Sequence, residues 1–93
     1  DTLVRSLHFA TREEEYRYEV DRNDTHQMLI KVLMDGKSRT AAQESMMNKA
    51  LQWRNQADTA AASADHATGV RLLEESTREL IRVIRSAGVF IPG

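Results

Sequence analysis

Residues that interrupt helices are rare in this sequence of 93 residues. It contains one proline, Pro92, and four widely spaced glycines. The stretches between them are rich in alanine, glutamate, arginine, leucine and glutamine, which have high helix propensity. Turn-forming residues gather near Gly36, Asp65 and Gly88. The chain is therefore predicted to form three long helices, over residues 12–35, 39–64 and 66–87.

Each predicted helix carries a stripe of residues spaced four and three positions apart, which places them on one helical face. The stripes are centred near Ile30, Trp53 and Leu80, and the first is polar in its middle, at Asn23 and Gln27. Helices of this length joined by short turns pack antiparallel to their neighbours in sequence. We therefore expect an all-α fold, an up-down-up antiparallel three-helix bundle whose stripes meet in one core.

An alternative stays open for residues 1–23. Tyr16, Tyr18 and Val20 alternate in the way that one face of a β-strand does, and residues 3–9 could supply the partner strand. Glutamate and arginine are poor strand formers, and an isolated two-stranded hairpin is only marginally stable. The pattern therefore favours a helix over a β-hairpin in this part of the chain.

The turn between the second and third predicted helices has a recognisable pattern. It consists of a small residue, an acidic residue and a ring-bearing residue, followed by small and aliphatic positions: Ala64, Asp65, His66, Gly69, Val70, Leu73 and Ser76. Residues 57–80 thereby resemble a tetratricopeptide-type helical hairpin. His66 replaces the usual aromatic residue and Gly69 the usual alanine, and no second copy follows. The resemblance implies a helical hairpin in the C-terminal half and docking through helix faces, without indicating binding residues.

Composition excludes several classes of protein. Thirteen basic and fourteen acidic residues give a formal charge of -1, so the strongly basic surface typical of nucleic-acid binding is not expected. The absence of cysteine excludes disulfides, thiol nucleophiles and cysteine zinc sites. No apolar run reaches the ~18–20 residues of a membrane span, and no signal segment is recognisable. We expect a soluble domain, and the composition does not indicate its compartment.

No arrangement of residues typical of catalysis or metal binding is present. His8, His26 and His66 are far apart and fall on different segments, whereas metal sites need close ligand clusters. The clustered carboxylates alternate with arginines at helix-pair spacing, which is typical of a solvated surface. Neither a glycine-flanked nucleophile nor a phosphate-binding loop is found. We therefore expect no enzymatic activity, catalytic residue, metal site or cofactor.

Two groups of residues are candidates for contacts with another protein. The first is apolar and lies in an N-terminal arm, residues 1–10, and in a tail, residues 88–93: Leu3, Leu7, Phe9, Val89, Phe90 and Ile91. The second is an arginine stripe on the third predicted helix: Arg71, Arg78, Arg82 and Arg85. This stripe could bind an acidic partner or simply be a charged outer face. Residues 1–36 hold five basic and eight acidic residues, so the first helix could itself lie beside the stripe.

These observations predict a non-enzymatic helical interaction or structural module. We expect residues 1–93 to form one domain of a larger protein and to mediate protein–protein contacts, of which homodimerisation is one form. The alternative is a helical bundle that senses a small ligand in a polar pocket between helices. Asn23, His26 and Gln27 would line that pocket, because buried polar groups need hydrogen-bond partners and a ligand can supply them.

Overall fold

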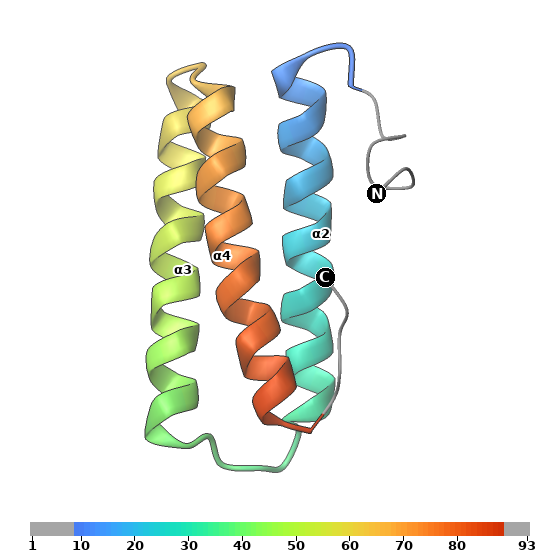
Figure 1. The fold of residues 1–93 in the computed structure, drawn as a ribbon, viewed down its shortest axis with the longest axis vertical. Helices are drawn as coiled ribbons and strands as arrows, with labels where there is room; N and C mark the ends of the chain where they lie inside the picture. Colours follow the sequence, from blue (N-terminus) through green and yellow to red (C-terminus); the bar gives the residue numbers. More distant parts are fainter. Residues whose placement is uncertain (1–8, 89–93) are drawn as a thin grey trace.

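The computed structural model describes residues 9–88 of the chain. They form three helices, α2 (Arg12–Leu33), α3 (Ala41–Ala62) and α4 (His66–Ser86), and this part of the chain contains no strand. In Figure 1, α2 and α4 run in the same direction and α3 runs in the opposite one. The predicted all-α, up-down-up three-helix bundle is confirmed, and the predicted helix ends agree within two residues. The alternative of a β-hairpin is wrong for residues 12–23, which are helical throughout.

Side chains at the first turns explain where the helices begin. The Thr11 hydroxyl accepts a hydrogen bond from the Glu14 backbone N–H at 3.1 Å, and the Glu14 carboxylate accepts one from the Ala10 N–H at 2.8 Å. At the start of α3, Thr40 and Gln43 form a reciprocal capping box. Each bond satisfies a donor that the helix itself leaves unpaired. The starts of the helices are therefore determined by local sequence.

Helix α4 is the central element of the bundle. It lies between α2 and α3 in Figure 1 and packs against both, whereas no Cα atom of α2 lies within 8 Å of one in α3. Nine of its residues are buried. The largest apolar cluster draws on all three helices and consists of Ile30, Met47, Ala50, Leu80, Val83 and Ile84. Most of the burial of α2 and α3 therefore depends on α4.

Two of the three residues at the centres of the predicted stripes lie in the core, and the third does not. Ile30 and Leu80 are 1% and 0% exposed, but Trp53 is only half-buried and lines a surface groove. The small residues Ala50 and Ala57 are buried in its place. Because small side chains let two helices approach closely, α3 contacts α4 through these alanines, and the large indole ring lies at the edge of the contact.

Candidate interaction surface

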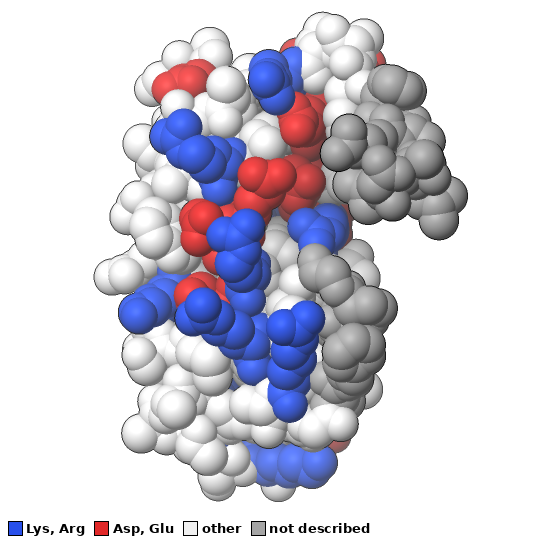
Figure 2. Space-filling view, viewed as in Figure 1, with Lys and Arg blue, Asp and Glu red and all other residues white. Residues whose placement is uncertain are grey.

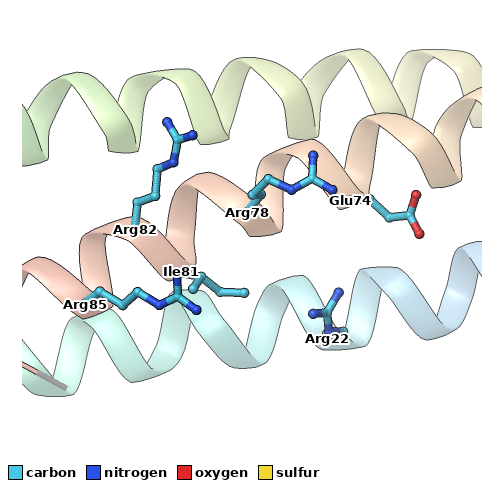
Figure 3. Close-up of a pocket in the computed structure, with 6 residues that line it drawn as sticks. All are labelled: Arg22, Glu74, Arg78, Ile81, Arg82 and Arg85. Carbon is cyan, nitrogen blue, oxygen red and sulfur yellow. The ribbon is translucent and has the colours of Figure 1, made fainter. Parts of the chain in front are cut away.

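A groove of about 490 Å³ lies between α2 and α4. Arg22 of α2 lines it, together with five residues of α4: Glu74, Arg78, Ile81, Arg82 and Arg85 (Figure 3). The α4 residues meet there because positions three and four apart share one side of a helix. Three of the four residues of the predicted arginine stripe therefore line a single groove, and the fourth, Arg71, is exposed outside it. The sequence pattern did not identify Arg22, because it lies on another helix.

Three of these arginines form ion pairs with a carboxylate on their own helix. Arg78 contacts Glu75 at 2.5 Å and Arg82 contacts Glu79 at 3.3 Å, while the side chains of both arginines remain about 60% exposed. On α2, Arg22 lies 3.4 Å from the Glu19 carboxylate. The exposed Arg78–Glu75 pair contributes only about 0–1 kcal/mol. The side chains of Glu19 and Glu79 are 9% and 12% exposed, so removing their arginines would leave poorly solvated carboxylates. A carboxylate from a partner can therefore replace Glu75 at little energetic cost.

A second groove, of about 400 Å³, follows the N-terminal half of α2 and is acidic. Three carboxylates line it, those of Glu15, Glu19 and Glu74, and Glu74 also lines the arginine groove. One basic residue, Arg12, lines it as well and pairs with Glu15 at 2.7 Å. Burial raises the pKa of Glu19 above its usual value, against the opposing effect of the nearby Arg22 charge. Figure 2 shows acidic side chains in the middle and upper part of this face, with basic ones among them, and basic side chains predominating below. Opposite charges are thus partly separated along the α2–α4 face.

Phe9 is the one terminal apolar candidate that the structure describes. Its ring is half-buried and lies 5.4 Å from the ring of Tyr18, at an angle of 47°, beside the acidic groove. The phenylalanine therefore packs onto its own α2. The other terminal candidates lie outside the described residues: Leu3, Leu7, Val89, Phe90 and Ile91.

The polar residues in the middle of the α2 stripe form a network inside the protein. Asn23 is fully buried, and its Nδ2 group donates to the hydroxyls of Ser76 at 3.0 Å and Thr77 at 2.9 Å. Its Oδ1 atom accepts from Gln27 at 2.8 Å and from Arg54 at 3.0 Å. Every hydrogen-bonding atom of this side chain is thus satisfied by the protein itself.

The three residues of the predicted ligand pocket do not face a common cavity. The His26 Nδ1–H donates to the Arg22 carbonyl at 2.7 Å on its own helix. Gln27 binds Asn23 and also lines a shallow groove of about 200 Å³. The polar interruption that suggested a ligand pocket therefore has an intramolecular explanation, and the ligand-sensing alternative stays a prediction.

A further polar cluster connects α2 to α3, and the sequence analysis did not find it. The Tyr16 hydroxyl donates to the Asp58 carboxylate at 2.6 Å, and Arg54 bonds to Asp24 at 2.7 Å and to Asp58 at 3.4 Å. Burial, followed by the hydrogen bond and charge of Asp58, raises the pKa of Tyr16 to about 12. These partners are thirty or more positions apart except Arg54 and Asp58, so local spacing gives no signal for most of the cluster. It holds together two helices whose backbones do not touch.

On the other side of α4, a groove of about 270 Å³ is lined by Trp53, Glu75 and Glu79 together with polar residues of α3. The Oε1 atom of Glu79 is buried there without a hydrogen-bond partner among the described residues. The carboxylates that pair with Arg78 and Arg82 thus line the α3 side of α4. Arg82 lines the arginine groove, and Figure 3 shows its side chain extending away from α2.

Within residues 9–88, no three histidine, aspartate or glutamate side chains lie close enough together to hold a metal ion. None of the three helices is long and apolar enough to cross a membrane. The structure confirms an antiparallel helical hairpin formed by α3 and α4, and its resemblance to a tetratricopeptide-type unit stays a prediction. In comparisons with known proteins, no family model, curated protein or solved structure matches this chain.

Proposed function

We propose that this chain is a non-enzymatic interaction module that docks an acidic protein segment in the groove between α2 and α4. The observation that carries the proposal is that Arg22, Arg78, Arg82 and Arg85 all line one groove. Guanidinium groups pair well with carboxylates, since their fork of N–H donors matches the two carboxylate oxygens.

The shape of the groove favours a helical segment as the partner. The groove runs between two helices, and the buried aliphatic residue Ile81 lines it among the arginines. An amphipathic helix can place an apolar side chain against such a residue while its carboxylates reach the rim. Arg22, Arg78 and Arg82 already form ion pairs within their own helices. We therefore expect the partner to bind with modest affinity, and its affinity to depend strongly on salt.

Fluorescence anisotropy with a short, labelled, glutamate-rich helical peptide tests this function. We expect wild type to bind the peptide at low salt, and binding to weaken as salt is added. The double variant Arg78→Gln/Arg82→Gln should bind roughly fivefold more weakly or worse, from about 0.5 kcal/mol for each lost pair. Arg71→Gln is the matched control, because Arg71 is an exposed arginine of the same helix that does not line the groove.

A peptide in which glutamine replaces glutamate controls for binding that does not depend on charge. If wild type fails to bind the glutamate peptide at low salt, the proposed function is wrong. It is also wrong if the double variant and the Arg71→Gln control bind equally well.

A further inference from the structure

We infer that the arginine groove has a specific occupant, a second copy of this chain, packed face to face and antiparallel about a twofold axis. This inference rests on the proposed function, because it uses the same groove. It adds that the acidic partner surface is the neighbouring half of the same face.

The first support is charge complementarity within one surface. Three carboxylates and one arginine line the acidic half: Glu15, Glu19, Glu74 and Arg12, which pairs with Glu15. Four arginines line the basic half, and both halves lie along the α2–α4 seam (Figure 2). A twofold axis that lies in the interface, perpendicular to the helices, exchanges the two halves. Each acidic half then faces a basic half, and every contact occurs twice. Packing the same faces with helices parallel would instead oppose like charges.

The second support is the register between α2 and α4. Asn23 is bonded to Ser76 and Thr77, so these residues lie at the same height along the bundle. At a rise of 1.5 Å per residue, Glu15 lies roughly 12 Å from this level toward the start of α2, and Arg82 lies roughly 8 Å from it in the opposite direction.

The same arithmetic places Glu19 roughly 6 Å from the level of Asn23 toward the start of α2, and Arg78 roughly 2 Å beyond it. Consider a twofold axis about 2 Å from the level of Asn23 toward the start of α2. It places Glu15 of one copy at the height of Arg82 of the other, and Glu19 at the height of Arg78. Arg22 and Glu74 lie close to the axis itself. The same axis places Arg12 at the height of Arg85, two like charges at the ends of the face. One axis thus matches the heights of three pairs of opposite charges and of one pair of like charges.

The dimensions of the molecule limit such a dimer. They are 41 × 31 × 17 Å, and the view in Figure 2 is onto the broad side, which also includes α3. A stable interface needs about 800 Å² from each partner, so the dimer has to use most of the α2–α4 part of this side. Since few apolar side chains line the two grooves, the dimer should be weak and sensitive to salt.

Charge reversal at one predicted pair tests the inference by sedimentation equilibrium at low salt. Glu15→Arg alone and Arg82→Glu alone should each weaken self-association at least tenfold, because each reversal replaces two attractions by two repulsions in the symmetric dimer. An equimolar mixture of these two single variants should associate about as well as wild type. The double variant Glu15→Arg/Arg82→Glu should also recover, since both of its intermolecular pairs are again opposite in charge.

Matched controls separate the predicted contacts from net charge. Arg71→Glu changes the charge as Arg82→Glu does, and Glu13→Arg changes it as Glu15→Arg does, yet neither control residue lines a groove. Both controls should dimerise like wild type. Circular dichroism at low protein concentration checks that every variant keeps its helices.

Wild type that remains monomeric at millimolar concentration in low salt overturns the dimer. So do single reversals that associate normally, or a mixture that fails to recover. In each of these cases the binding of the glutamate-rich peptide to wild type still tests the proposed function separately. Peptide binding without self-association would mean that the groove takes an acidic segment from another protein.

Discussion

At the scale of single residues, the buried amide of Asn23 is the most informative group in the protein. It joins α2 to α4 through Ser76 and Thr77, and it accepts a hydrogen bond from Arg54 of α3. Removing the hydrogen-bond partners of a buried polar group destabilises the folded protein by the full desolvation penalty of that group. This side chain therefore contributes to the specific arrangement of all three helices, although an asparagine in a predicted apolar stripe looks unfavourable in the sequence.

We predict that Asn23→Ala lowers the free energy of unfolding by about 2–4 kcal/mol, because it leaves a cavity and unpaired hydroxyls. Urea denaturation followed by circular dichroism measures the change. The control is Asp24→Ala, which removes an ion pair between exposed Asp24 and partly buried Arg54. Because Arg54 keeps its bonds to Asn23 and Asp58, the loss should be about 1 kcal/mol. Equal losses in the two variants would contradict the account of the buried network.

At the scale of the helices, local sequence predicted the elements better than their packing. The starts and ends were predicted within two residues, because capping side chains and turn residues act over a few positions. The position of Trp53 was not predicted correctly. A stripe indicates which face of a helix is buried, but it does not indicate how closely the neighbouring helix approaches. Here the neighbour approaches the alanines, and the large ring lies outside the contact.

The helices pack closely around Gly69. A Cβ atom added there would lie 2.9 Å from Cε1 of Tyr16 and 3.3 Å from the backbone oxygen of Ala57. The glycine therefore lets α4 pack against a tyrosine of α2 and the backbone of α3 at the same level. In an isolated helix alanine would be favoured over glycine by roughly 1 kcal/mol.

We predict that Gly69→Ala nevertheless destabilises the bundle by about 1–3 kcal/mol, since the clash exceeds the gain in helix propensity. The same substitution in a Tyr16→Ala background should cost less, because removing the ring relieves the shorter contact. Thermal unfolding of the four proteins of this double-mutant cycle measures the coupling. A stabilising effect of Gly69→Ala on its own would show that the helices do not pack this closely.

At the scale of the whole molecule, the partial separation of charge is the feature on which the proposed function rests. The formal net charge of -1 does not indicate this separation, because a net charge carries no information about where the opposite charges lie. The arginine stripe was predictable, since its members lie on one helix at regular spacing. The contributions of Arg22, Glu15 and Glu19 required the structure, because they come from a helix about fifty positions earlier in the chain.

The central claim is that the face formed by α2 and α4 docks an acidic partner surface. The most direct measurement is a titration of ¹⁵N-labelled protein with the glutamate-rich peptide, followed by two-dimensional NMR. The account predicts that backbone and arginine signals of residues 78–85 and of Arg22 shift in a saturable, salt-sensitive way, while those of residues 49–56 near Trp53 stay in place. Shifts confined to the Trp53 side, or no saturable shift on the α2–α4 face at low salt, would contradict it.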